Sequence, residues 1–335
     1  VVMSVPVSAE TFRVNVHSTA TSPDGHTWDT AFVDIQSAVD AAYAVGGGEV
    51  WVAAGTYTAT SDPVLTMREN VTIYGGFTGI ETFRDERDWI LNKTIIDGEN
   101  IRRCVIGANA ATLDGLSIRL GYCKDNGGGI YNETGSQTLC NCIIEENTSE
   151  SYGGGMYNGY PSEPILTNCM LKGNVSSKGG GGISNHFSNS KLSSCELREN
   201  KSSGGSGIYN SNSSLEMEKC IISDNISMGN EYLKGGGIVN DSSSLLMTSC
   251  YITGNKGVYG GGIRNEKEMQ LTNCVIENNS SNYGGGIFCD VNSDTQLMNC
   301  TIVANMADEG GGLYVLTDSA WNEFSLVNCI VWDNS

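Results

Sequence analysis

The sequence is dominated by a six-residue block that recurs through the C-terminal two thirds of the chain. The block reads Gly-Gly-Gly-Ile-Tyr-Asn at 127–132, and variants of it begin at 153, 180, 205, 235, 260, 284 and 310. Successive copies lie 24 to 30 residues apart. A recurring period of this size is typical of repeat proteins, whose units stack on one another. Any fold for this chain must therefore accommodate a solenoid with about 26 residues per repeat.

A second motif recurs once in each repeat beside the first and places a cysteine and an asparagine at fixed positions. It reads Leu-x-x-Cys-x-Ile-x-x-Asn, as at 139–147. A spacing of two residues puts the cysteine and the following aliphatic residue on one face of a short strand. The cysteines at this position are Cys142, Cys169, Cys195, Cys220, Cys250, Cys274, Cys300 and Cys329. The asparagines five residues later are Asn147, Asn174, Asn200, Asn225, Asn255, Asn279, Asn305 and Asn334.

Stacking explains why these residue types recur. One repeat cannot bury its own apolar side chains, whereas a stack of repeats can. Equivalent positions then lie one strand spacing apart, roughly 4.8 Å, so the inward Ile, Leu and Cys form ladders in a narrow core. Asparagines at strand ends are expected to form amide ladders, and triple glycine suits a sharp corner. The sequence predicts an all-β parallel β-helix, whose register extends back to Leu116, Gly121 and an inward Cys104.

The segment before the repeats predicts one α-helix. Apolar residues recur at helical spacing from Phe32 to Ala42, with Asp29 or Thr30 as the expected N-cap and Gly46 as the stop. A helix before the first coil would cover the open end of the core, where strand edges and apolar side chains are otherwise exposed. We therefore expect an N-terminal capping helix.

These patterns divide the chain into three parts. Residues 1–28 are a leader or a first strand, 29–112 hold the capping helix and irregular first coils, and 113–335 hold the regular repeats. The tripeptide Val-Ser-Ala at 7–9 suits a secretory cleavage site, and an ordinary first strand fits the segment equally well. The sequence ends in mid-coil, directly after the last ladder asparagine, so we expect the repeat region to be truncated there.

The charge of the chain restricts its partners. The formal net charge is -19. An acidic surface argues against nucleic acid and against an anionic membrane, and it disfavours a polyanionic substrate unless cations intervene. No apolar run reaches the roughly 18 residues of a membrane span. We expect no nucleic-acid partner, no membrane span in this chain, and a monomer.

The cysteines and histidines indicate neither a disulfide framework nor a metal site. Eight of the 12 cysteines share one ladder position, where in-register side chains point the same way and offer poor disulfide geometry. We expect these thiols to be reduced and buried, acting as small apolar residues. The three histidines, His17, His26 and His186, are scattered, so we expect no metal and no cofactor.

Two stretches resemble known families. The segments GGGEVWVAAGTYT at 46–58 and VTIYGGFTGIETFRDERDW at 71–89 resemble the start of secreted bacterial β-helix proteins of the pectate-lyase-like superfamily. The repeats are similar to those of chlamydial polymorphic outer membrane proteins, although glycine replaces alanine and Ile or Leu replaces Phe in the motif. The resemblance implies a right-handed β-helix and an exported, often surface-attached protein. Adhesins occur among such relatives, and shared fold alone carries no activity over.

The sequence gives little indication of catalytic groups. Polysaccharide lyases on this scaffold need a base near calcium-binding carboxylates, and glycosidases need two nearby carboxylates. The two outward positions before each ladder asparagine carry no carboxylate cluster. This row favours a solvated face over a catalytic site, and the catalytic residues are unknown.

A different outward row holds the candidate ligand-binding residues. The residue after the block isoleucine is aromatic in five of eight repeats. Exposed rings in a row stack on sugars or contact a protein partner, although stacked tyrosines also favour strand pairing by themselves. We expect Ser184 to leave a gap between rings, which would cradle a flat sugar. The candidate residues are Tyr131, Tyr157, Ser184, Tyr209, Phe288 and Tyr314.

Two functional hypotheses remain. In the first, the chain is an extracellular or cell-surface β-helix with a structural or adhesive role, which binds a glycan or surface protein without catalysis. In the second, it is a polysaccharide lyase or glycoside hydrolase whose site uses irregular loops, such as 228–234 or 318–324. The sequence favours the first because its repeats are regular and no catalytic group is assembled.

Overall fold

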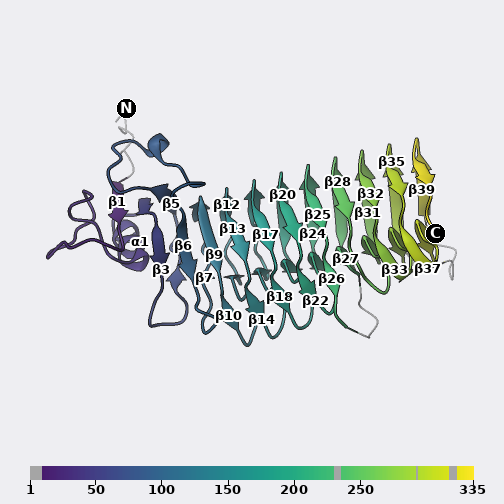
Figure 1. The fold of residues 1–335 in the computed structure, drawn as a ribbon, viewed down its shortest axis with the longest axis horizontal. Coiled ribbons are helices and arrows are strands. Elements are labelled where there is room, and N and C mark those ends of the chain that lie inside the picture. The colour runs from purple at the N-terminus through teal and green to yellow at the C-terminus, as the bar shows by residue number, and fades with distance from the viewer. Residues whose placement is uncertain (1–9, 230–234, 292, 317–322) are drawn as a thin grey trace, which may run out of the picture.

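The protein is an elongated stack of parallel β-coils with an α-helix at its N-terminal end (Figure 1). The computed structural model describes residues 10–229, 235–291, 293–316 and 323–335. The cleavage-site motif at 7–9 and most of the loops 228–234 and 318–324 lie outside these residues. Each coil contributes one short strand to each of three long sheets, and equivalent residues pair at offsets of about 26. The predicted all-β parallel β-helix is confirmed.

Sheet A has 12 strands among the described residues and lies along one side of the stack. In spatial order its strands are β1 (Glu10–Val14), β2 (Gly48–Ala53), β5 (Val71–Phe77), β8 (Thr112–Asp114), β12 (Thr138–Cys140), β16 (Ile165–Thr167), β20 (Asn189–Ser193), β24 (Ser214–Glu218), β28 (Ser244–Thr248), β31 (Glu268–Thr272), β35 (Asp294–Met298) and β39 (Glu323–Val327).

Sheet B follows sheet A in every coil. Its strands are β3 (Gly55–Tyr57), β6 (Thr94–Asp97), β9 (Leu116–Arg119), β13 (Ile143–Glu145), β17 (Met170–Lys172), β21 (Glu196–Arg198), β25 (Ile221–Ser223), β29 (Tyr251–Thr253), β32 (Val275–Glu277), β36 (Thr301–Val303) and β40 (Ile330–Trp332).

Sheet C holds the Ile-Tyr-Asn part of each block. Its strands are β4 (Leu65–Thr66), β7 (Val105–Ile106), β11 (Ile130–Asn132), β15 (Met156–Asn158), β19 (Ile183–His186), β23 (Ile208–Ser211), β27 (Ile238–Asp241), β30 (Ile263–Asn265), β34 (Ile287–Cys289) and β38 (Leu313–Val315). Two minor sheets lie between sheets B and C along the chain. They contain β10 (Tyr122–Cys123), β14 (Thr148–Ser149), β18 (Val175–Ser176), β22 (Lys201–Ser202) and β26 (Ile226–Ser227), then β33 (Ser280–Tyr283) and β37 (Met306–Glu309).

Two asparagine ladders run through the interior. In the first, the predicted one, Asn225 Oδ1 accepts hydrogen bonds from both the backbone N–H and the Nδ2 of Asn200, each at 3.0 Å. The second joins the block asparagines, as between Asn132 Nδ2 and Asn158 Oδ1 at 2.9 Å. All four of these side chains are fully buried. Each amide finds a partner in a neighbouring coil, which offsets much of the cost of burial, although Asn132 Oδ1 has no partner among the described residues.

The cysteine ladder lies in the apolar core, as predicted. The ladder thiols from Cys142 to Cys300 are buried, and all 12 cysteines are free. Cys220 Sγ donates to the carbonyl oxygen of Leu192 at 3.5 Å, a residue of the preceding coil. The extended register also holds, because Leu116 and Cys104 are buried in the same core.

The glycine blocks form the corner that leads into sheet C. Gly153 has a φ of 68°, in the left-handed region that favours glycine. A Cβ on Gly154 would lie 2.4 Å from the carbonyl oxygen of Val175 in the next coil. Glycine is needed here because neighbouring backbones approach too closely for any side chain.

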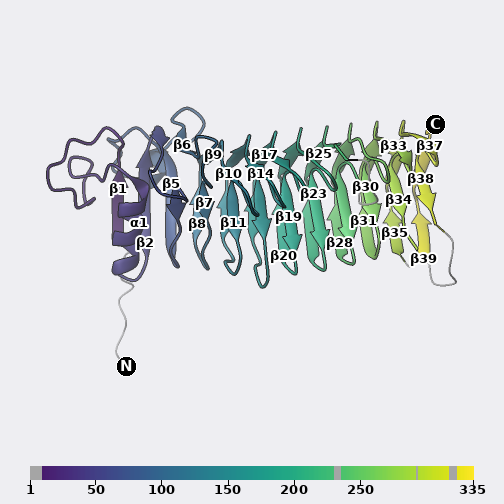
Figure 2. The ribbon, with the colours of Figure 1, turned by 90° about the horizontal axis from the view of Figure 1, so that it is seen from below.

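The capping helix forms where expected but begins later. Helix α1 (Ile35–Ala44) lies at the end of the stack (Figure 2) and packs against β1 and β2. Its N-cap is Asp34, whose side chain accepts from the backbone N–H of Ser37 at 2.8 Å. The prediction of Asp29 or Thr30 as the cap was wrong, because that segment forms a turn before the helix. Helix η1 (Arg84–Glu86) is a short 3-10 turn in the 78–93 segment.

Candidate functional site

The predicted aromatic row lies on the outer face of sheet C. Tyr131 and Tyr157 pair in register on β11 and β15. Their ring centroids are 5.5 Å apart with an interplanar angle of 10°, and both rings are half-buried. Arg103 places its guanidinium carbon 4.6 Å from the centre of the Tyr131 ring. This end of the row forms a partly exposed, stacked aromatic surface.

The gap expected over Ser184 is occupied by the protein itself. Ser184 is fully buried, and its Oγ lies 3.0 Å from Nε2 of His186. The His186 ring lies 5.3 Å from that of Tyr157 and 5.5 Å from that of Tyr209, measured between centroids. Residues two apart on a strand share a face, so His186 can lean into the space beside Ser184. The expectation of an open sugar cradle there was wrong.

Two further candidates are covered as well. Tyr209 and Phe288 are 5% and 3% exposed. Tyr152 stacks on Tyr209 with 5.7 Å between centroids, and Tyr259 meets the edge of Phe288 at 5.2 Å. Both covering rings come from the segments that precede the glycine blocks, which fold over sheet C.

Tyr314, the last candidate, is half-buried and stacks on Phe288 with 5.5 Å between centroids. Ligand binding at the row stays a prediction for Tyr131, Tyr157 and Tyr314, whose rings reach the surface. The buried members of the row support the same face from beneath.

A charged cluster that the sequence reasoning missed lies on the same face. Asp241, Glu266 and Asp290 follow the strand positions of sheet C in three successive coils. Arg264 Nη2 lies 2.9 Å from Glu266 Oε1 and 2.9 Å from Asp290 Oδ2. The residue directly after the six-residue block carries this signal, whereas the carboxylates considered above were those in the row before the ladder asparagine of sheet B.

Burial shifts the pKa values of two titratable groups on this face, Glu266 and His186. Burial raises the pKa of the Glu266 carboxyl to about 7, with Asp241 and Asp290 acting in the same direction and Arg264 opposing them. Burial lowers the pKa of His186 to about 4, so its imidazole is neutral at pH 7. Tyr209 donates its hydroxyl to Asp241 Oδ2 at 3.0 Å. The face thus combines aromatic rings with a carboxyl that titrates near neutrality.

The chemistry available at this face is hydrogen bonding, ring stacking and proton exchange. Among the described residues, no group of three or more His, Cys, Asp or Glu is arranged to hold a metal ion. Within the same residues, no helix is long and apolar enough to cross a membrane.

Comparison with known proteins agrees with this architecture. Residues 178–331 match the model of the family described as right-handed beta helix region. The crystal structure of the pectate lyase Pel9A aligns with a TM-score of 0.63 at 14% identity, covering 98% of this chain and 80% of that one. This chain therefore has a right-handed parallel β-helix fold.

Sequence relatives fall among carbohydrate-active proteins. The mannuronan C5-epimerase AlgE3 of Azotobacter vinelandii is 39% identical over 85 residues, which are 24% of this chain and 4% of that protein. The epimerase AlgE5 of the same organism is 33% identical over 120 residues, which are 34% of this chain and 11% of that protein. The chain thus spans a small part of the relatives it matches. The likeness to polymorphic outer membrane proteins stays a prediction.

Proposed function

We propose that this chain binds a neutral polysaccharide along the outer face of sheet C, as an exported or cell-surface β-helix. The observation that carries the proposal is the partly exposed stack of Tyr131 on Tyr157, which continues into further aromatic residues along the coils. Because the two rings stack on each other, they present their edges and hydroxyl groups outward, which suits contacts with the C–H and hydroxyl groups of sugar rings. The likeness to segments of mannuronan C5-epimerases supports a carbohydrate as the ligand class.

The charge of the face favours a neutral ligand. Asp241, Glu266 and Asp290 lie along the row beside Arg264, with Arg103 over the Tyr131 ring and Lys178 over the Tyr152 ring, in a chain of net charge -19. A polyanionic glycan would be repelled by this surface unless cations intervened. The role is then adhesive or structural, with binding and no turnover.

One observation favours a second candidate, a carbohydrate-active enzyme acting at the same face. A carboxyl with a pKa of about 7, as at Glu266, is suited to donate or accept a proton at neutral pH. Arg264 beside it could stabilise negative charge that develops on a substrate. In this candidate Glu266→Gln abolishes turnover of a polysaccharide while leaving its binding in place.

A glycan array followed by variants tests the binding proposal. Tyr157→Ala should weaken binding of a neutral glycan about tenfold, because a stacking ring is lost. The same change should lower stability by only about 1 kcal/mol, since the ring contacts Tyr131 and His186 but stays half-exposed. Tyr43→Ala, which removes an exposed ring on α1, is the matched control and should change neither.

The proposal fails if the wild-type chain binds no neutral glycan, or if Tyr157→Ala and Tyr43→Ala bind alike. A screen of neutral and acidic polysaccharides for new reducing ends or unsaturated products decides between the two candidates. Turnover that Glu266→Gln removes would replace the adhesive role with the enzymatic one.

A further inference from the structure

A groove with a cavity volume of about 400 Å³ runs over the outer face of sheet B at its N-terminal end. Its floor is formed by Ile95, Ile143 and Met170, which are the outward residues of β6, β13 and β17. Trp89 and Ile90, from the segment 78–93 between β5 and β6, form one wall. None of the predicted site residues lies here, so the groove is a separate surface from the aromatic row of sheet C.

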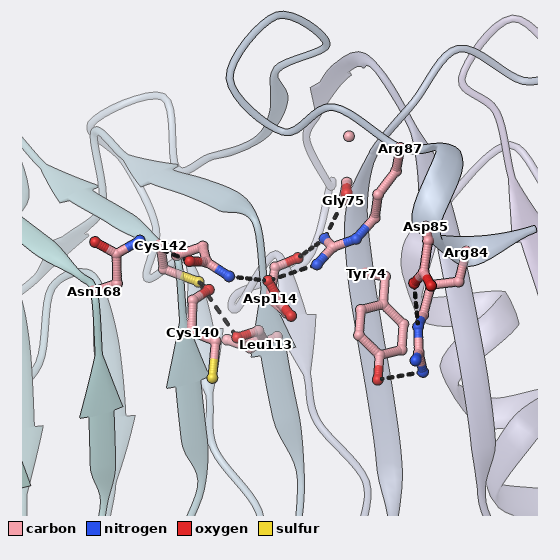
Figure 3. A network of polar contacts seen from close by, with 12 residues as sticks. Tyr74, Gly75, Arg84, Asp85, Arg87, Leu113, Asp114, Cys140, Cys142 and Asn168 are labelled. Carbon is pink, nitrogen blue, oxygen red and sulfur yellow. Dashed lines mark hydrogen bonds and ion pairs between the residues drawn. The ribbon is translucent and has the colours of Figure 1, made fainter. Parts of the chain in front are cut away.

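The wall is fixed to the coils by an arginine. Arg87 Nη1 donates to the carbonyl oxygens of Gly75 at 3.0 Å and Asp114 at 3.2 Å, and Nη2 pairs with Asp114 Oδ1 at 2.9 Å (Figure 3). Asp88 N–H donates to the Gly76 carbonyl oxygen at 2.9 Å. These contacts hold the segment against two coils, so the position of Trp89 is set before any ligand arrives.

Glycine provides the room that Trp89 needs. Gly115 has a φ of 75°, and a Cβ built there would lie 2.7 Å from the Cβ of Trp89. Trp89 as a whole is half-buried. The ring is therefore closely packed at its base and partly exposed beyond it.

A row of amides continues from the anchor along the corner between sheets A and B. Asn141 Nδ2 donates to Asp114 Oδ1 at 2.8 Å, and Asn168 Nδ2 donates to Asn141 Oδ1 at 2.7 Å (Figure 3). Asn141 and Asn168 both line the groove. These hydrogen bonds link the side of the groove to the same Asp114 that anchors the insert.

The lining of the groove contains equal numbers of cationic and anionic side chains. Lys93 is exposed at its edge and makes no ion pair with the residues that the structure describes, while Arg119 is paired with Asp97 at 2.9 Å. Glu145 and Glu196 supply two carboxylates among the lining residues. Two cations and two anions cancel locally, although the whole chain carries -19.

We propose that this groove is a second saccharide-binding site, which takes one or two rings of a neutral glycan. Its apolar floor and Trp89 provide the stacking surface, and Lys93, Arg119 and Glu145 provide hydrogen bonds to hydroxyl groups. Hydroxyls both donate and accept, so they fit a mixed set of charged side chains better than a ligand of one sign does. A volume of about 400 Å³ lies within the range of pockets that enclose small ligands.

Isothermal titration of the full chain with neutral trisaccharides (cellotriose, laminaritriose, maltotriose and mannotriose) tests this site. At least one should bind the wild type, and Trp89→Ala should weaken it roughly tenfold or more, as loss of a tryptophan anchor does. Phe83→Ala removes an exposed ring from the same segment but outside the groove, and should leave the affinity unchanged.

A second pair of variants keeps the test valid if Trp89→Ala loosens the segment. Lys93→Ala changes an exposed side chain without an ion pair among the described residues, and should weaken binding about threefold. Tyr157→Ala, on sheet C, should leave this affinity unchanged. The proposal is overturned if no trisaccharide binds, if Lys93→Ala and Phe83→Ala both match the wild type, or if trigalacturonate binds more tightly than every neutral probe. Loss of binding in Tyr157→Ala alone would refute this groove and support the sheet C site.

Discussion

The ladder asparagines show how single residues fix the register of the stack. Asn225 Nδ2 donates to the Leu197 carbonyl oxygen at 3.0 Å and to Asn255 Oδ1 at 2.9 Å, while its Oδ1 serves Asn200. One side chain therefore satisfies buried polar groups in both neighbouring coils. An amide in this position is required because no apolar side chain of similar size could replace these contacts.

Asn225→Ala is expected to lower the free energy of unfolding by about 2–5 kcal/mol, because the backbone N–H of Asn200 and one of its two Nδ2 protons lose their acceptor. Thermal unfolding and hydrogen exchange at the Asn200 amide measure this. Asn282→Ala is the matched control, since that amide is exposed and bonds only Asp308 at 3.0 Å. It should cost no more than about 0.5 kcal/mol. Equal losses in the two variants would contradict the ladder as a source of stability.

Glu266 makes the stability of the sheet C face depend on pH. Its folded pKa of about 7 lies above the ordinary value of 4.5, so the folded state holds the proton more tightly. The contribution of Glu266 to stability is therefore full below about pH 4.5 and is lost as pH rises to 7. His186 acts in the opposite sense, because its lowered pKa of about 4 makes stability fall as pH drops below 6.5.

Comparing Glu266→Gln with the wild type between pH 4.5 and 8 isolates the first effect. Over this range, the free energy of unfolding of the wild type should fall by up to roughly 3 kcal/mol relative to that of the variant. A Glu266→Gln profile that runs parallel to that of the wild type would contradict a raised pKa at Glu266.

At the scale of elements, the insert 78–93 is held to the rest of the chain by two arginines, Arg87 and Arg84, and by the backbone bond from Asp88 to Gly76. The Arg87 and Asp114 side chains are only 14% and 16% exposed, whereas Arg84 is 44% exposed and pairs with Glu49 at 3.0 Å. Loss of one partner from a shielded pair leaves the other charge poorly solvated. The two arginines of the same segment therefore differ in what they stabilise.

Arg87→Ala should release the insert while leaving the repeat region folded, because each coil depends mainly on its neighbours. Limited proteolysis should cut within 78–93 at least about tenfold faster in this variant. Arg84→Ala should be cut at nearly the wild-type rate, since an exposed ion pair contributes little. Similar cleavage of both variants would show that Asp114 does not anchor the segment.

The periodic elements could be predicted from the sequence, and the irregular ones could not. The same strand pattern recurs in every repeat, so the inward position of Cys220 or Asn225 follows from spacing alone. The gap at Ser184 was misjudged because His186 and Tyr152 fill it through side-chain packing, which a repeat pattern does not encode. The groove under Trp89 depends on a single insert, so nothing in the repeat indicates it.

At the scale of the whole molecule, the core is one continuous column of packed apolar side chains, and α1 covers its N-terminal end. The 12 thiols are distributed along it, nine buried and three half-buried. Burial raises the pKa of Cys104 to about 12, so its reactive thiolate is scarce at neutral pH.

Thiol labelling of the native chain at pH 7.5 should therefore be fast at no more than three sites, which are Cys123, Cys140 and Cys329. In denaturant all 12 should react. Mass spectrometry of the labelled peptides identifies the fast sites. Rapid labelling of Cys195 or Cys250, or disulfides between neighbouring coils, would contradict a closed core.

Because successive coils pair in register, one whole repeat could be removed from the chain while the remaining coils still pair. Ile183 pairs with Ile208, 25 residues further on, and Asn185 pairs with Asn210 in the same way. Excising 183–207 would join one glycine corner directly to the next strand of sheet C, leaving every remaining strand beside a neighbour of its own kind. The product would be a shorter rod, by one strand spacing of roughly 4.8 Å. If a linear glycan binds along the rod, as we propose, the number of coils rather than any single residue would set how many sugar units it contacts. That number would change with each repeat gained or lost.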